Sequence, residues 1–221
     1  MDGVEINNNI KALLEDLVTR FPELHVCLEP ITKVFLLLRN IFTSGKKLLV
    51  CGNGGSAADA EHFSGELLKG FLKKRPLPLM LKTNFSAFAG NSDQWIDRLQ
   101  KGLPVLPLNT NTALISAVSN DIGADLIFAQ QVLSYGIAGD SILAISTTGN
   151  SDNIIKAVIV AKGLGLHTIG LTGQENGKLG DLCEFLIKVP AFQTFKVQEF
   201  HLPVYHVLAA MLEEEFFSNE N

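Results

Sequence analysis

A histidine and a glutamate four residues apart, His62 and Glu66, follow a glycine-rich segment at residues 51–56. A four-residue step turns an α-helix by about 400°, so both side chains leave the same helix face and can converge on one ligand or metal ion. An imidazole and a carboxylate beside an anion-binding loop are suited to moving protons on a phosphorylated molecule. The pair therefore indicates acid–base chemistry.

The glycine-rich segment follows a short apolar run and ends at Ser56, a residue type that favours helix N-caps. A strand, a glycine turn and a helix N-terminus together present free backbone N–H groups to an anion. The segment matches neither a nucleotide P-loop nor a dinucleotide fingerprint, so we expect no nucleotide cofactor. Taken alone, the glycines could form only a tight connection; the histidine and glutamate favour a binding site.

A second polar segment, residues 146–151, follows another apolar run and precedes a helical pattern. Its hydroxyl groups at a helix N-terminus are suited to binding a phosphate, although an ordinary capping loop has the same composition. Ligands bind at the carboxyl ends of strands in open α/β sheets. Two such segments therefore predict a sugar phosphate bound between them.

Five short apolar runs alternate with helix-length segments, at residues 48–51, 103–108, 141–145, 168–171 and 185–189. This alternation predicts an α/β fold with a doubly wound, mainly parallel five-stranded sheet flanked by helices. Two helical stretches, residues 4–20 and 24–44, precede the sheet and are predicted to pack against its edge or a partner subunit. With no repeats or long linkers, we expect one domain over residues 1–221, with an N-terminal helical extension at residues 1–45.

The composition is typical of a soluble enzyme: 221 residues, 47% hydrophobic, 19% charged, with a net charge of -5. The acidic balance does not favour nucleic acid, and the three cysteines lack metal-ligand spacing, which favours a reducing compartment. No apolar run approaches the ~20 residues that span a membrane, and the first residues do not resemble a signal peptide. We therefore expect a cytoplasmic protein with neither membrane nor nucleic acid as a partner.

Together the glycine-rich segment, the His62 and Glu66 pair and the hydroxyl-rich segment resemble the sugar isomerase (SIS) domain, and phosphoheptose isomerases in particular. The similarity runs from about residue 23 to about residue 217 and is interrupted at residues 77–102. It implies the SIS fold and conversion of D-sedoheptulose 7-phosphate into D-glycero-D-manno-heptose 7-phosphate. It also implies a homotetramer with active sites shared between subunits.

Carried over position by position, the resemblance implies a quartet of metal-binding or acid–base residues, His62, Glu66, Gln198 and His206. As catalytic residues, Glu66 would move the carbon-bound proton through an enediol and His206 would serve the oxygens as an acid. The implied substrate-binding residues are Asn53, Gly54, Gly55, Ser56, Glu66, Asn120, Asp121, Ser146, Thr147, Thr148, Ser151 and Gln198.

The quartet could bind one zinc ion per subunit, because two histidines, a carboxylate and an amide oxygen form a site able to polarise a carbonyl. A glutamine ligand is uncommon, and the same residues could act as acid and base without metal. By themselves, His62 fits an ordinary helical histidine and His206 a core histidine.

Several residues depart from the pattern that the resemblance implies. The insertion at residues 77–102 contains the only tryptophan, Trp95, and could be a lid, an interface arm or a surface excursion. Phe195 and Gly70 stand where the family usually has an aspartate and an arginine, so the preferred sugar could differ. The nearby basic residues could supply charge to a phosphate or form a solvated face; they are Lys69, Lys73, Lys74 and Arg75.

Pro203 lies between Gln198 and His206 and lacks a backbone N–H. Either one helix tolerates the proline, or Gln198 belongs to a preceding turn and only His206 to the helix.

Two other functions fit the same sequence: a non-catalytic SIS-domain regulator that binds sugar phosphates, and an isomerase of another phosphosugar. The fold does not discriminate among them. The presence of Glu66 and His206 favours the enzyme, because the related regulator lacks the equivalents of both.

Overall fold

The computed structural model describes residues 6–89 and 93–218. Its five strands are β1 (Leu48–Gly52), β2 (Val105–Pro107), β3 (Ser141–Ile145), β4 (His167–Thr172) and β5 (Phe185–Lys188). They form one sheet in the order β2-β1-β3-β4-β5, and every neighbouring pair is parallel. The predicted doubly wound sheet is confirmed.

Helices cover both faces of the sheet. One face carries α2 (Leu28–Thr43), α3 (Gly55–Leu68) and α9 (Thr194–Phe217), while the other carries α6 (Ile127–Tyr135), α7 (Asp152–Gly163) and α8 (Gly177–Leu182). Successive residues of β1 alternate between two cores: Leu48 and Val50 join the first, Leu49 and Cys51 the second. Because both faces are buried, the strands are apolar along their length, which is why they could be predicted from the sequence.

The N-terminal helices pack against α9 and β5 of the same chain. The first is α1 (Asn8–Arg20), whose N-cap Asn7 accepts a hydrogen bond from the backbone N–H of Ile10 at 2.9 Å; residues 4 and 5 of the predicted stretch lie outside the described residues. The second stretch is not one helix but a 3-10 helix, Pro22–Cys27, followed by α2. Pro30 explains the break, because a proline cannot donate to the fourth preceding carbonyl and its ring clashes there.

Helix α9 runs without interruption through Pro203, so Gln198 and His206 belong to the same helix. This outcome confirms the first of the two alternatives. Eight residues separate Gln198 from His206, which places them roughly 12 Å apart along the helix axis.

An apolar stretch, residues 112–135, is long and apolar enough to cross a membrane by length and composition, which the sequence analysis did not anticipate. In the structure it comprises α5 (Thr112–Val118), a π-helical segment (Ser119–Gly123), a short 3-10 helix (Ala124–Leu126) and α6. Gly123 adopts φ 150°, which interrupts the helical backbone. A membrane span requires an unbroken helix with every backbone group paired, so this geometry favours a helical hairpin instead, in which α6 joins the core of the sheet through Phe128 and Val132.

The segment after α3 is anchored by a buried ion pair between Arg75 and Glu213 of α9, whose Nε and Oε1 atoms are 2.8 Å apart. Arg75 also donates to the carbonyl oxygens of Glu66 and Leu67, at 2.9 and 2.8 Å. The last carbonyls of a helix lack intrahelical partners, so the guanidinium caps the C-terminus of α3. The sequence analysis gave two interpretations of the basic residues, a source of charge for a phosphate or a solvated face. Both are wrong for Arg75, whose side chain is buried in this ion pair.

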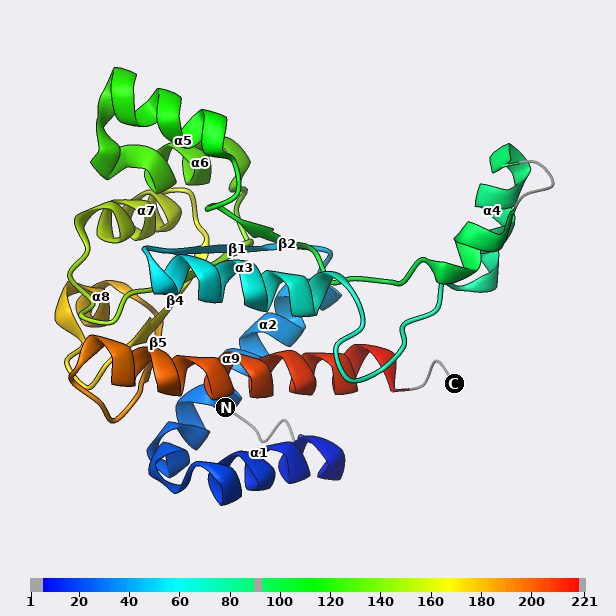
Figure 1. Cartoon of the computed structure of the whole chain (residues 1–221), viewed down its shortest axis with the longest axis horizontal. Helices are drawn as coiled ribbons and strands as arrows, with labels where there is room; N and C mark the ends of the chain where they lie inside the picture. The colour runs from blue at the N-terminus through cyan, green and yellow to red at the C-terminus, as the bar shows by residue number, and fades with distance from the viewer. Residues whose placement is uncertain (1–5, 90–92, 219–221) are drawn as a thin grey trace.

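The insertion, residues 77–102, forms an arm that projects from the body of the molecule (Figure 1). It contains α4 (Leu79–Ala89) and a 3-10 helix (Asp93–Arg98); residues 90–92 lie outside the described residues. None of the α4 residues is buried, and Phe88 is 93% exposed. The arm leaves from the C-terminal end of α3, far from the glycine-rich loop at its other end. Within one chain it is not a lid over that loop.

Glu213→Gln should lower the free energy of unfolding by about 3–5 kcal/mol, because it leaves the buried Arg75 guanidinium without a counter-charge. Chemical denaturation at fixed protein concentration would measure the change. Glu15→Gln, at an exposed position of α1, is the matched control and should change the value by less than about 0.5 kcal/mol. Equal stability of the two variants would show that the pair does not anchor the fold.

Candidate active site

The two polar loops meet where the strand order reverses. The β1–α3 loop leads to the helix layer on one face, and the β3–α7 loop leads to the layer on the other. Because β1 and β3 are adjacent, the loops open side by side at their carboxyl ends, as expected of a ligand site in a doubly wound sheet. A cavity of about 300 Å³ lies between them, lined by Asn53, Gly54, Gly55, Ser56, Ile145, Ser146, Thr147, Ser151, Thr194 and Gln198.

The β1–α3 loop depends on glycine at two positions. Gly54 is the N-cap of α3 and adopts φ 55° and ψ -120°, a conformation that strains other residues. A Cβ on Gly55 would lie 2.5 Å from Gln198 Nε2, so its absence makes room for that side chain at the cavity. The expectation that Ser56 caps the helix is therefore wrong; Ser56 is a buried residue of the first turn.

The β3–α7 loop contributes hydroxyl groups and is joined to the first loop. Ser146 Oγ and Ser151 Oγ lie 3.2 Å apart, and both line the cavity. Asn53 and Asn153 exchange side-chain amide hydrogen bonds of 2.9 Å, which connect the two loops directly. The N-termini of α3 and α7 therefore converge on one cavity, where their free N–H groups and dipoles favour an anion.

Further along α3, an acid–base cluster faces α9. His62 Nε2 lies 3.2 Å from Glu66 Oε1, and the His62 and His206 rings are 5.0 Å apart between centroids. Glu66 Oε2 and His206 Nε2 are buried without a hydrogen-bond partner. Buried polar atoms are rarely left unpaired in folded proteins, so two neighbouring orphans indicate groups that meet a ligand. Burial, and then the nearby His62, lowers the pKa of His206, which favours its neutral form.

The structure places the other predicted residues as follows. Gln198 lies at the phosphate-sized cavity beside Gly55, while the other three members of the quartet lie together further along α3 and α9. Thr148 lines a separate shallow cavity with Thr147. Asn120 and Asp121 are exposed on the π-helical segment and hydrogen-bond to each other at 2.7 Å. They do not line the cavity of their own chain.

Two residues of this region were missed from the sequence. They are Tyr205 and Asp59: the Tyr205 hydroxyl group is hydrogen-bonded both to His62 Nδ1 and to Asp59 Oδ1. Asp59 precedes His62 by three residues, a spacing that puts both on one helix face. The spacing could therefore have identified Asp59 from the sequence. The contact of Tyr205 with His62 depends on how α3 and α9 pack, so the sequence alone does not reveal it.

The zinc hypothesis can be tested against the donor atoms. Among the described residues, no three His, Cys, Asp or Glu side chains are placed to hold a metal ion. The unpaired Glu66 Oε2 and His206 Nε2 nevertheless supply lone pairs of the kind that bind zinc. The same two atoms can also accept hydrogen bonds from the hydroxyl groups of a sugar, so zinc binding stays a proposal.

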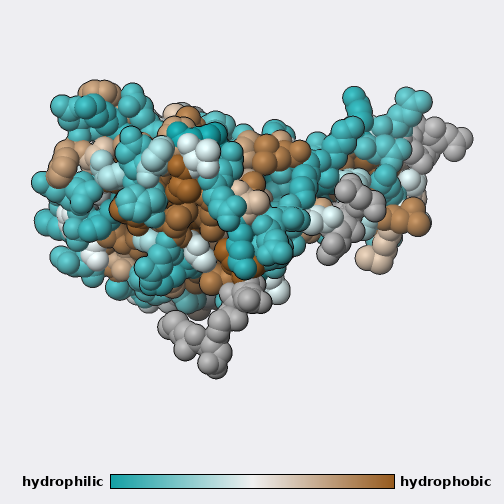
Figure 2. All heavy atoms as spheres, turned by 90° about the horizontal axis from the view of Figure 1, so that it is seen from below, coloured by the Kyte–Doolittle hydropathy of each residue, from teal (hydrophilic) through white to brown (hydrophobic). Residues whose placement is uncertain are grey.

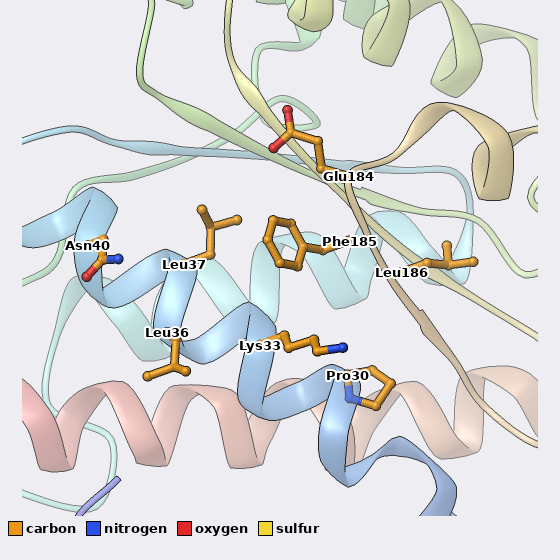
Figure 3. A pocket seen from close by; sticks show the side chains of 8 residues that line it. All are labelled: Pro30, Lys33, Leu36, Leu37, Asn40, Glu184, Phe185 and Leu186. Carbon is orange, nitrogen blue, oxygen red and sulfur yellow. The ribbon is translucent and has the colours of Figure 1, made fainter. Parts of the chain in front are cut away.

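A larger cavity, about 630 Å³, lies between α2 and β5, away from the two loops (Figure 3). It is lined mainly by apolar side chains, including Leu36, Leu37 and Phe185, and by none of the candidate residues. Its polar lining residues, Lys33, Asn40 and Glu184, lie outside both polar loops and outside the acid–base cluster, so this cavity is not the candidate site despite its size.

Comparisons with known proteins agree with this geometry. The SIS domain family model matches residues 95–173. A solved structure of a phosphoheptose isomerase from Neisseria gonorrhoeae has a TM-score of 0.71 and 30% sequence identity, covering 93% of this chain and 97% of that one. The fold and site therefore define a sugar isomerase (SIS) domain protein.

The sequences of named relatives identify the family within the class of SIS domain proteins. The phosphoheptose isomerase of Aneurinibacillus thermoaerophilus is 38% identical over 180 residues, covering 81% of this chain and 78% of the relative. That of Rhodospirillum rubrum is 35% identical over 96% of this chain and 100% of the relative. The chain belongs to the phosphoheptose isomerase family, a family of sugar phosphate isomerases.

Gly55→Ala should force the Gln198 side chain out of the cavity, because the new Cβ would lie 2.5 Å from its amide nitrogen. We expect inorganic phosphate to bind about tenfold more weakly by calorimetry, the equivalent of one hydrogen bond of about 1.4 kcal/mol. Gly65→Ala, in the same helix with nothing within 4 Å of the added carbon, should bind phosphate normally. Unchanged affinity in Gly55→Ala would exclude Gln198 from the anion site.

Proposed function

We propose that this protein is an isomerase that converts D-sedoheptulose 7-phosphate into D-glycero-D-manno-heptose 7-phosphate through an enediol. The observation that carries the proposal is the pair of buried atoms Glu66 Oε2 and His206 Nε2, which have no hydrogen-bond partner and lie on the same two helices whose N-terminal ends line the anion cavity. The nearest charge to Glu66 Oε2 is that of Lys69 Nζ, at 4.0 Å. The relatives named phosphoheptose isomerase support the choice of substrate.

In this proposal the phosphate binds between the two loops. The backbone N–H groups at the start of α3 and α7, with the hydroxyls of Ser146, Thr147 and Ser151, surround the cavity. Gly55 and His62 are seven residues apart, roughly 10 Å along the helix axis. That separation suits an open-chain sugar with its phosphate at one end and its carbonyl at the other.

Proton transfer falls to the acid–base cluster further along α3 and α9. The Glu66 carboxylate removes the proton from one of the two carbons and returns it to the other, since its Oε2 atom accepts no hydrogen bond from the protein. His206, neutral because burial lowers its pKa, exchanges protons with the substrate oxygens. Asn53, Gly54 and Gln198 orient the chain between these two ends.

A zinc ion is compatible with this proposal. Of the four residues that the resemblance assigns to zinc, His62, Glu66 and His206 lie together and would hold one ion per subunit, whereas Gln198 lies at the anion cavity, roughly 12 Å from His206 along α9. A bound zinc would polarise the carbonyl as a Lewis acid. The reaction requires no nucleotide cofactor. We place it in the cytoplasm.

The preferred sugar could differ from that of the relatives, and two positions support this alternative. Phe195 is 57% exposed beside Thr194, which lines the cavity, so an apolar ring stands where an aspartate is usual. Gly70 has no room for a side chain, because a Cβ there would lie 2.3 Å from Gln100 Oε1 and from the Lys73 carbonyl. The base of the arm therefore occupies the place of the customary arginine.

We also propose that the chain folds as one SIS domain and assembles as a homotetramer with shared active sites. Exposed Asn120 and Asp121 would then complete the site of a neighbouring subunit. The arm supports association, since Leu79, Met80 and Phe88 are 80%, 72% and 93% exposed, and Figure 2 shows hydrophobic residues on the arm and on the body. An 11-residue helix without buried residues is marginal by itself and gains stability from a partner surface.

Glu66→Gln should reduce turnover of sedoheptulose 7-phosphate by about 10²–10⁴-fold, because the amide keeps the size of the side chain but cannot act as a base. NMR of the heptose 7-phosphate product, with and without zinc, would measure it, and phosphate affinity should be retained. Glu61→Gln, an exposed position on the same helix, is the matched control. Full turnover in Glu66→Gln would contradict the mechanism, and a folded wild-type protein that binds phosphate without turnover would favour another sugar or a regulatory role.

Replacing residues 77–99 with a short glycine linker should give an assembly with fewer subunits than the proposed wild-type tetramer. The ends of the arm are adjacent, since Pro76 and Gln100 form an antiparallel bridge, so the excision should leave the body intact. Light scattering coupled to size-exclusion chromatography would give the mass of each assembly, which divided by the mass of its own subunit gives the number of subunits. A monomeric wild-type protein would contradict the tetramer, and an unchanged number of subunits would place the interface away from the arm.

A further inference from the structure

Tyr205 lies between the two histidines of the site. It is 1% exposed, and its ring contacts those of His62 and His206 edge-on, at centroid distances of 5.6 and 5.0 Å. The hydroxyl group lies 3.0 Å from His62 Nδ1 and donates to Asp59 Oδ1 at 3.3 Å. Four groups therefore form a continuous sequence of contacts: Asp59, Tyr205, His62 and Glu66.

The number of hydrogens on each group determines which group donates and which accepts in the two hydrogen bonds of the Tyr205 hydroxyl. A phenol has one hydrogen, and a carboxylate only accepts, so the Tyr205 hydrogen is directed to Asp59. The phenol oxygen then accepts, and the hydrogen it accepts is that of His62 Nδ1–H.

The hydrogen bond at His62 Nδ1 affects the other ring nitrogen of the same residue, Nε2. With a hydrogen on Nδ1, His62 directs Nε2 at Glu66 Oε1, 3.2 Å away; because a carboxylate only accepts, this contact is a hydrogen bond in the form of His62 that carries a second hydrogen, on Nε2. In enzymes and metal sites, the partner of one imidazole nitrogen fixes which form the other nitrogen presents and how the ring is oriented. Nothing else among the described residues is hydrogen-bonded to His62 Nδ1.

We propose that Tyr205, held by Asp59, is a positioning residue that fixes the His62 ring with Nδ1–H on the phenol oxygen and Nε2 directed at Glu66. The role of Tyr205 in turnover rests on the proposed isomerase function. The role of Tyr205 in orienting the His62 ring does not, because its hydrogen bonds to His62 and Asp59 are present in the protein without substrate.

Tyr205→Phe keeps the ring packing and removes only the hydroxyl. We expect kcat for the sugar phosphate to fall about 10–100-fold, the range seen when the outer partner of a functional histidine is removed. KM should stay within about twofold, because the phosphate loops are untouched. Tyr135→Phe, at the chain's other tyrosine, partly exposed on α6, is the matched control and should behave as wild type.

Asp59→Asn provides a second variant that keeps an acceptor oxygen for the phenol. It should reduce kcat less than Tyr205→Phe, and the double variant should be no slower than Tyr205→Phe, since the two residues act in series. Additive losses would overturn the arrangement in series. If Tyr205→Phe fails to fold, Asp59→Asn carries the same test.

Nitrogen-15 NMR of the histidine rings gives a readout that does not depend on activity. In the wild-type protein His62 should show a protonated Nδ1, and Tyr205→Phe should shift this signal toward a mixture of ring forms, whereas Tyr135→Phe should not. If both the His62 signals and kcat are unchanged in Tyr205→Phe, the proposal is overturned. If the wild-type protein lacks isomerase activity, the proposed function fails, and the NMR comparison still decides the positioning role.

Discussion

The buried ion pair of Arg75 and Glu213 connects the elements on which the site depends. Arg75 closes the C-terminal end of α3 through the carbonyls of Glu66 and Leu67, and Glu213 belongs to α9. Glu213 also accepts backbone N–H groups from the segment that follows α3, at Phe71. Two charges removed from water are stable only when paired in this way, so the contact strongly specifies how the two helices align.

That alignment places different chemistry at successive turns of α3 and α9. The N-terminal turns lie at the anion cavity with Gly55 and Gln198, and later turns bring His62 and His206 within ring contact. A phosphate at one end and a carbonyl at the other match this division. The same alignment puts the Tyr205 hydroxyl against His62, so one packing arrangement determines both the reacting groups and their orientation.

The arm at residues 77–102 projects from the body of the fold (Figure 1). Residues 69–76 connect it to the C-terminal end of α3, and the backbone N–H of Gly70 donates to Gln100 Oε1 at 3.1 Å. The arm itself points away from the chain's own cavity and exposes apolar side chains. Its consequences are therefore expected between subunits.

The sequence by itself determined the five strands, the parallel sheet and the two loops, because strands buried on both faces are uniformly apolar and anion loops require glycine and hydroxyl residues in fixed order. It also determined the His62 and Glu66 pair, a local spacing on one helix. Only the tertiary structure decided the burial of Arg75 and the contact of Tyr205 with His62. These features depend on which surfaces meet when distant helices pack, and residue order along the chain does not encode such contacts locally.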